Sequence, residues 1–278
     1  MADALRTWGT SLRQTWRLLP EAGPAVRVLL SSNGATPAEI KSRLPYEAAR
    51  AGDAAGVAPG VKRDRDERRY RDERFVLQTV GLVYEQDGHL VVTEFGRTVL
   101  RWLDLLHGGN APVLGRHAAL ALAACQLRNP TGAGSKYDSS MFVFPFAFIW
   151  RAMLSLDDRL SSAELLRAVL KVRNHHELDD AIKRIAGARR SGDIGSLGAP
   201  ISNLNDRAIP WMGLASFGWV LIRDKSNYPS GDYYTINPAA RSAIARAASL
   251  PLLHRDFQSP QEYAEHISAS AVLPPVLA

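Results

Sequence analysis

Apolar residues in the first hundred positions recur every three or four residues, which is the spacing of amphipathic helices. The first such stretch is Leu5–Leu19, and a mostly apolar run follows at Ala25–Leu30. Thr36 and Glu39 have the spacing of a capping box and predict the start of a short helix. A longer, highly charged helix is expected over Lys62–Val80. The pattern therefore predicts an N-terminal amphipathic helix, two short helices, a linker and a longer helix.

The pattern then changes from helical spacing to that of a β-hairpin. Two short apolar stretches, Leu82–Glu85 and His89–Thr93, flank an Asp-Gly turn, and a helix is expected directly afterwards over Glu94–Leu106. This order of elements, with a threonine placed to cap the helix after the second strand, resembles the winged helix-turn-helix family. The resemblance covers about Pro24–Leu106.

The second half of the chain also ends in a hairpin and a capped helix. After an apolar helix at Ala111–Leu127 and a Gly/Ser/Asn-containing linker, helices are expected at Pro145–Leu156, from the capping box Ser161–Glu164 to about Lys171, and from Asn174 to about Arg190. A loop, a helix at Asp206–Gly218, strands at Trp219–Ile222 and Asp232–Ile236, and a helix capped by Asn237 complete the pattern.

A hairpin followed by a capped helix thus occurs twice, as a repeat of pattern without matching residue identity. We expect a mainly α protein with small β-hairpin wings, an α+β class, built from two winged helix-turn-helix modules. The expected division is residues 1–128 for the N-terminal helix, the first module and its trailing helix, residues 137–250 for the second module, and residues 251–278 for a C-terminal extension.

Charge adds a hint about the partner. The 278-residue chain has a net charge of +6, and only six of its 34 basic residues are lysine. Arginine forms bidentate contacts with phosphates and guanine edges, so this balance favours nucleic acid as the partner. A GC-rich genome that encodes arginine in preference to lysine explains the same composition.

The candidate DNA contacts are cations and polar residues at the positions that a recognition helix and wings would occupy. In the long charged helix, Arg68, Arg71 and Gln78 fall opposite the apolar face. The alternative is a solvated helix with ion pairs such as Asp64–Arg68. Cations near residue 190 also complement the helix dipole without any ligand. The full set is Lys62, Arg63, Arg65, Arg68, Arg71, Arg74, Gln78, Lys183, Arg184, Arg189, Arg190, Arg207, Arg223, Lys225, Asn227 and Tyr228.

Signals for catalysis are poor. The single cysteine, Cys125, lies in an apolar context typical of a core thiol, and His175-His176-Glu177 lacks the spacing of a zinc motif. We expect no cofactor and no metal. No apolar run reaches the roughly 18 residues that span a bilayer, and the amino terminus lacks a secretory signal pattern, so a cytoplasmic protein without membrane contact is expected.

The second half adds a more specific resemblance. Pro145–Ile149 followed by Leu160–Leu165 is similar to the opening of the second recognition subdomain in modular restriction endonucleases, of type IIS-like or modification-dependent kinds, which place tandem winged helices beside a separate nuclease domain. The resemblance implies a double-stranded-DNA-binding specificity module of a restriction or phage-defence system that reads a sequence or a modified base. No nuclease motif is visible in this chain, so cleavage would fall to another domain or subunit.

Two other functions fit the same pattern. A winged-helix transcription regulator would use similar modules and should dimerise on a palindromic site. A winged-helix protein-interaction module would bind its partner through apolar faces.

Overall fold

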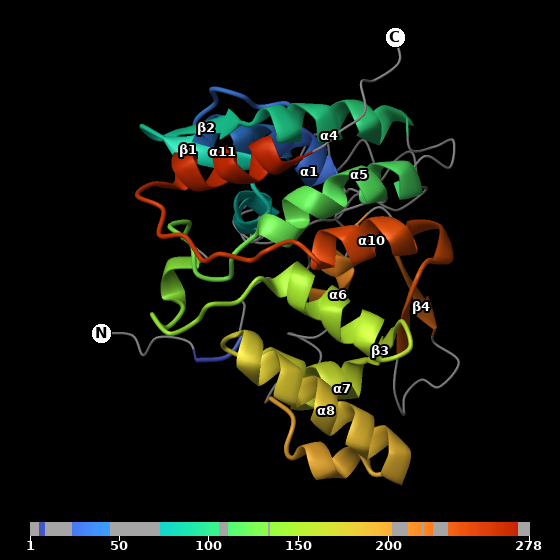
Figure 1. Cartoon of the computed structure of the whole chain (residues 1–278). Helices are drawn as coiled ribbons and strands as arrows, with labels where there is room; N and C mark the ends of the chain where they lie inside the picture. The colour runs from blue at the N-terminus through green and yellow to red at the C-terminus, as the bar shows by residue number, and fades with distance from the viewer. Residues whose placement is uncertain are drawn as a thin grey trace.

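The computed structural model describes residues 6–8, 24–44, 73–105, 111–132, 134–201, 211–217, 220–224 and 233–271. Over these ranges the protein is mainly helical and has two small antiparallel sheets, which confirms the expected α+β class. In Figure 1 the elements before α5 lie at the top, α6 to α8 lie at the bottom, and α5 and α10 lie between them. None of the described helices combines the length and apolar character needed to cross a bilayer.

The first unit follows the predicted order closely. The Asp-Gly turn has the backbone that a tight hairpin needs, with φ of 48° at Asp87 and 76° at Gly88. Thr93 caps the next helix as expected, because its Oγ1 accepts a hydrogen bond of 3.1 Å from the Gly96 N–H. The elements are α1 (Pro24–Leu30), helical residues 37–44 and 73–79, β1 (Val83–Gln86), β2 (His89–Val92) and α4 (Glu94–Leu105).

A short segment before the second helix, residues 33–35, is hydrogen-bonded to the hairpin. The Gly34 N–H donates to the Leu90 carbonyl at 2.7 Å, and the Leu90 N–H donates to the Ala35 carbonyl at 2.9 Å. The side-chain oxygen of Asn33 accepts a further bond of 2.9 Å from the Val92 N–H. Strand β2 is therefore hydrogen-bonded on both edges, to β1 and to this segment.

The second unit has the same arrangement, including a strand that the sequence pattern did not predict. The pattern predicts a turn at residues 157–159; Asp157 and Asp158 do turn, each with φ of 58°, but Arg159–Ser161 then forms β3. Strand order is β3-β5-β4, all antiparallel. The elements are α6 (Pro145–Ser155), β3, α7 (Ser162–Arg167), α8 (His175–Ser191), β4 (Leu221–Asp224), β5 (Tyr233–Ile236) and α10 (Arg241–Ala248), with short 3₁₀ turns η4 (Val169–Lys171), η5 (Ile194–Leu197) and η7 (Pro238–Ala240).

The internal repeat thus extends beyond the two hairpins. In each unit a short segment, residues 33–35 or β3, is hydrogen-bonded to the second hairpin strand and runs into a capping box, formed by Thr36 and Glu39 or by Ser161 and Glu164. The box satisfies otherwise unpaired N–H groups at the start of the next helix. Both units therefore share the order helix, short segment hydrogen-bonded to the hairpin, capped helix, further helical residues, hairpin and helix, and this segment is a strand, β3, in the second unit.

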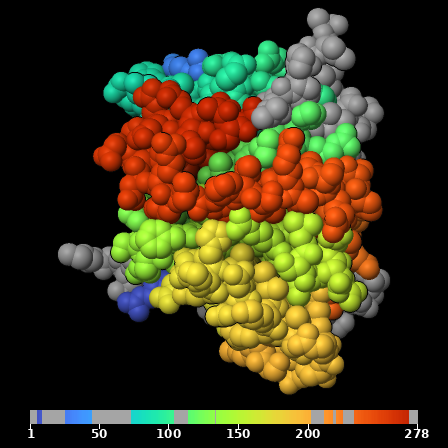
Figure 2. Space-filling model, in the orientation of Figure 1, coloured from blue at the N-terminus to red at the C-terminus, as the bar shows by residue number. Residues whose placement is uncertain are grey.

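The ends of the chain connect the two units. Helix α11 (Pro260–Ser270) comes from the predicted C-terminal extension and packs on β1, α4 and α5 (Ala111–Ala124) of the first half. Tyr263 on this helix donates its hydroxyl to the Thr79 carbonyl at 2.7 Å, and Ser268 Oγ accepts from the Phe95 N–H at 3.1 Å. Figure 2 shows the C-terminal residues as a continuous red and orange band between the two halves.

The amino-terminal end crosses in the opposite direction. Trp8 is fully buried and donates its indole N–H to the Val172 carbonyl at 2.7 Å, and Trp211 donates its own to the Trp8 carbonyl at 2.9 Å. Trp8 therefore belongs to the core of the second half, although the expected division grouped it with the first module. Most of the helix expected over Leu5–Leu19 lies outside the described residues.

Two helical glycines provide a matched test of this packing. An alanine Cβ at Gly96 in α4 would lie 2.3 Å from the Leu82 carbonyl oxygen, whereas one at Gly187 in α8 would meet no atom within 4 Å. We expect Gly96→Ala to lower the free energy of unfolding by roughly 1–3 kcal/mol, because α4 must move away from the hairpin. Gly187→Ala should raise it by about 0.4–1 kcal/mol through the lower entropy of the unfolded chain. Urea denaturation of both variants measures the two effects; equal changes in the two would contradict the close contact of α4 with the start of the hairpin.

Candidate nucleic-acid interface

The charged helix of the first unit is described only from residue 73 onward. Five of its candidate DNA contacts, Lys62, Arg63, Arg65, Arg68 and Arg71, lie outside the described residues.

Arg74 links this helix to the hairpin. Its Nη1 pairs with the Glu85 carboxylate on β1, and its guanidinium carbon lies 5.2 Å from the centroid of the Phe75 ring. Its side chain is only 18% exposed. Arg74 therefore holds the helix against the first hairpin, which is a structural role in addition to any contact with a ligand.

Gln78 does not face solvent, which corrects the expectation that it lies on an outward side of the helix. It is 4% exposed. Segments distant in sequence cover this end of the helix: Lys136 places its ammonium 5.5 Å from the Phe75 centroid, and Tyr263 of α11 binds the Thr79 carbonyl. The spacing of apolar residues revealed only the face of this helix that packs on the first unit. Contacts with segments distant in sequence bury a second face, which the spacing does not reveal.

The tip of the first hairpin is exposed but carries no cation. Its residues are Gln86, Asp87, Gly88 and His89, and His89 Nδ1 lies 2.9 Å from the Asp87 carbonyl oxygen. This tip can offer hydrogen bonds to a ligand but has no lysine or arginine.

The cations of α8 divide into exposed and structural ones. Lys183 and Arg190 are exposed, and Lys183 makes an exposed ion pair of 3.4 Å with Asp180. Arg184 is exposed as well and donates to the Leu197 carbonyl at 2.9 Å. These three side chains remain on the surface, as a DNA contact requires.

Arg189 is instead part of the interior, which corrects its expected place on the DNA-facing surface. It donates to both oxygens of Glu164, at 2.7 and 2.9 Å, and to the carbonyls of Leu156 and Arg159. Glu164 is fully buried, and the Arg189 side chain is 16% exposed. Arg189 thus has four protein acceptors, and two of them are the oxygens of the buried Glu164 carboxylate. These bonds connect α8 to the capping box of α7.

This ion pair also sets the protonation of Glu164. Burial raises the pKa of this carboxyl, but the hydrogen bonds from Arg189 and the Ser161 N–H outweigh that effect and hold the pKa below its usual value. Glu164 is therefore a charged, fully buried group that depends on Arg189 for its compensation.

The second hairpin positions its arginines in a way that the sequence pattern did not predict. Arg223 on β4 lies opposite Tyr234 in the sheet register, and its guanidinium carbon is 5.7 Å from the centroid of that buried ring. Arg159 on β3 is exposed, and its guanidinium carbon lies 5.6 Å from the centroid of the Tyr233 ring. Arg207, Lys225, Asn227 and Tyr228 lie outside the described residues.

Two further cations join Arg184, and the sequence pattern missed both. Arg167 at the end of α7 and Lys171 in η4 bind the carbonyls of Gly198 and Ala199, next to the carbonyl that Arg184 binds. Their spacing of four residues was visible in the sequence, but the loop that gathers all three side chains was not. The second half thus presents a cluster of positive charge between α7 and α8.

Comparison of this fold with solved structures gives a match over nearly the whole chain. The binding domain of the BpuJ1 endonuclease, in complex with pyrene- and phenanthrene-modified DNA, superposes with a TM-score of 0.55 at 13% sequence identity. The match covers 92% of this chain and 96% of the other. The chain shares the fold of that binding domain. The sequence matches no model of a protein family and no curated protein.

The BpuJ1 endonuclease binding domain and the present chain share their fold across both halves of the chain. At 13% identity the comparison shows the fold alone.

Groups with catalytic potential are structural in the described part of the chain. Cys125 is fully buried and burial raises the pKa of its thiol far above the usual value, so it is a core thiol, as expected. His175 lies with its Nδ1 3.0 Å from Arg151, and burial followed by the Arg151 charge lowers its pKa. Among the described residues, no group of three histidine, cysteine or acidic side chains could hold a metal ion.

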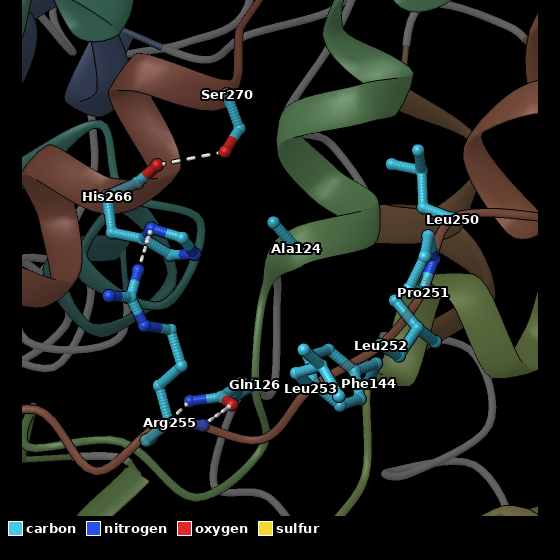
Figure 3. Close-up of a pocket in the computed structure, with 10 residues that line it drawn as sticks. All are labelled: Ala124, Gln126, Phe144, Leu250, Pro251, Leu252, Leu253, Arg255, His266 and Ser270. Atoms are coloured by element: carbon cyan, nitrogen blue, oxygen red, sulfur yellow. Dashed lines mark hydrogen bonds between the residues drawn. The ribbon is translucent and has the colours of Figure 1, made fainter.

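A cavity of about 540 Å³ lies between α5, α11 and the segment that joins α10 to α11. Figure 3 shows Leu250, Pro251, Leu252 and Leu253 along one side and His266 on the other, with Arg255 reaching toward His266. Arg255 Nη1 lies 3.0 Å from His266 Nδ1, and the Gln126 amide is hydrogen-bonded to the Arg255 backbone in both directions. These polar groups hold the connecting segment in place.

The Glu164–Arg189 pair yields a stability prediction. Arg189→Ala leaves a buried carboxylate uncompensated and should lower the free energy of unfolding by about 3–5 kcal/mol at neutral pH. The neighbouring exposed Arg190→Ala is the control and should change it by less than about 0.5 kcal/mol. Urea denaturation followed by circular dichroism measures both free energies. A small decrease for Arg189→Ala would show that this arginine behaves as a surface residue.

The same pair predicts a pH dependence. Because the pKa of Glu164 is lower in the folded than in the unfolded state, its contribution is present above the unfolded value of about 4.3 and is lost as the pH falls through the lower folded value. Stability measured from neutral to acidic pH should therefore fall less steeply in Glu164→Gln than in the wild type. Parallel curves for the two proteins would show that the pair does not stabilise the fold.

Proposed function

We propose that this chain is a double-stranded-DNA-binding specificity module of a restriction or phage-defence system, built from two winged helix-turn-helix units. The observation that carries the proposal is the repeated order of helix, short connecting segment, capped helix, further helical residues and hairpin, in which the connecting segment (residues 33–35 or β3) is hydrogen-bonded to the second hairpin strand. The binding domain that shares this fold is itself bound to DNA.

The second unit has two helical segments before its hairpin, and their burial suggests which one contacts DNA. In helical residues 211–215, Trp211, Met212 and Ala215 are at most 1% exposed, and the Trp150 indole binds the Ala215 carbonyl. Helix α8 instead exposes Lys183, Arg184 and Arg190. We assign α8 as the helix that approaches the duplex.

In the first unit, the proposed contacts come from the residues before position 73, where the sequence pattern predicts the start of the charged helix. Arg74 and Gln78 are held in the structure of the unit itself, so the contacts fall to Arg68, Arg71 and their basic neighbours. In this scheme arginines contact phosphates and guanine edges, while the tips of the hairpins add hydrogen bonds. Cleavage is assigned to a separate nuclease domain or subunit.

Binding-site selection tests this function directly. The full chain is offered random duplex libraries, one unmodified and one methylated, at low salt. We expect enrichment of one asymmetric site, because two non-identical units in one chain contact different half-sites. Enrichment of a palindrome would instead indicate a dimeric regulator, and failure to retain any duplex would reject DNA binding.

Variants of the charged helix test the assignment of its residues. Arg68→Ala/Arg71→Ala should weaken binding to the selected site and reduce the salt dependence of the association constant by about 0.9 for each phosphate that is no longer neutralised. Arg74→Ala is the matched comparison and should mainly reduce stability, because it breaks the pair with Glu85. Unchanged DNA affinity in the double variant would remove this helix from the interface.

A further inference from the structure

Three cations from three successive elements meet at one loop in the second half of the molecule. Arg167 at the end of α7 donates to the Gly198 carbonyl, Lys171 of η4 donates to the Ala199 carbonyl at 2.6 Å, and Arg184 of α8 donates to the Leu197 carbonyl at 2.9 Å. The loop turns at Gly198, whose φ of 85° favours glycine. Consecutive carbonyls of one short loop therefore hold the three side chains together.

Among the ion pairs of the described residues, none joins Arg167, Lys171 or Arg184 to a carboxylate. The ion pairs found there involve other side chains: Arg97 and Arg101 pair with Glu94, and Arg173 pairs with Glu177. Burial lowers the pKa of Lys171, and the charges of Arg184 and Arg167 lower it further, as expected for like charges in close proximity. The carbonyl groups orient these cations but carry no net charge, so the repulsion persists.

The three side chains also keep hydrogen-bonding capacity at the surface. A guanidinium has five N–H donors and an ammonium has three, and the bonds described above use one donor of each side chain. Arg184 is exposed, and Arg167 and Lys171 are partly exposed. A tetrahedral oxyanion placed over the cluster would receive several charge-assisted hydrogen bonds and relieve the repulsion among the cations.

We propose that Arg167, Lys171 and Arg184 form a binding site for the phosphodiester backbone of duplex DNA. The proposal rests on the proposed function and adds to it a backbone anchor on α7, η4 and α8. Figure 1 shows these helices at the end of the molecule opposite α11 and the first unit. Contacts with phosphates set the position of a protein along a duplex, so this site would fix the register of α8. The protein's own carbonyls already hold the three side chains, which therefore lose little entropy when they bind.

The test compares two triple variants that change the net charge equally. The site variant is Arg167→Gln/Lys171→Gln/Arg184→Gln. The control is Arg97→Gln/Arg101→Gln/Arg173→Gln, whose arginines are exposed and paired with carboxylates. Dissociation constants for a fluorescent duplex of random sequence are measured by anisotropy between about 50 and 200 mM salt, the range over which phosphate contacts dominate the change in affinity.

We expect the site variant to reduce the slope of log K against log salt by about 0.9 for each phosphate that is no longer neutralised and to weaken binding at least about tenfold near 100 mM salt. The control should change the slope by less than about 0.9, the value for a single phosphate. An unchanged slope in the site variant, or an equal reduction in the control, rejects the phosphate site while the proposed function stands. A wild-type protein that binds no duplex at low salt rejects the proposed function itself.

Single variants keep the test valid if the triple variant does not fold. Lys171→Gln should reduce the slope by about 0.9, since it removes one charge and one hydrogen bond to the loop. Arg184→Lys retains the charge and should leave the slope near that of the wild type. Circular dichroism and thermal unfolding confirm that each variant is folded, and a slope reduced as much in Arg184→Lys as in Lys171→Gln would contradict an electrostatic contact.

Discussion

Residues near each end of the chain pack on the opposite half of the molecule, and the relative placement of the two units depends on these contacts. Trp8 lies in the core of the second half, where its indole N–H and its carbonyl oxygen each bind a partner more than 160 residues away. Helix α11 lies on the first half, where Tyr263 binds the Thr79 carbonyl. Buried aromatic side chains with satisfied polar groups contribute large apolar area and a fixed orientation. The two repeated units are thus parts of one continuous core.

This connection bears on how a duplex would be read. Two units joined by a flexible linker would each bind with their own orientation, and their spacing would be set by the linker. Here α10 contacts both α5 and α6, and α11 returns to the first hairpin. Surfaces on the two units are therefore held at a set separation, which suits recognition of two half-sites in one register.

The many arginines of the chain serve two different purposes. Arg189 compensates a buried carboxylate, and Arg151 binds the carbonyls of Ala248 and Leu250 at the end of α10. Such side chains contribute to net charge but not to an interface. Arg167, Lys171 and Arg184 are also anchored by carbonyls, yet they lie at the surface without a described carboxylate partner. Net charge therefore indicates a class of partner, and only the environment of each cation indicates a contact.

The sequence alone determined the elements whose signals are local. The Asp-Gly turn, the capping threonine at position 93 and the capping boxes at Thr36 and Ser161 each involve residues a few positions apart, so their hydrogen bonds could be anticipated. Tertiary structure decided the rest. Strand β3 forms because β5 pairs with it, Gln78 is buried although it lies opposite the apolar face of its helix, and Arg189 binds Glu164, 25 residues earlier. The basic cluster likewise depends on a loop that brings carbonyls to side chains from three elements, a contact between distant residues that leaves no periodic pattern in the sequence.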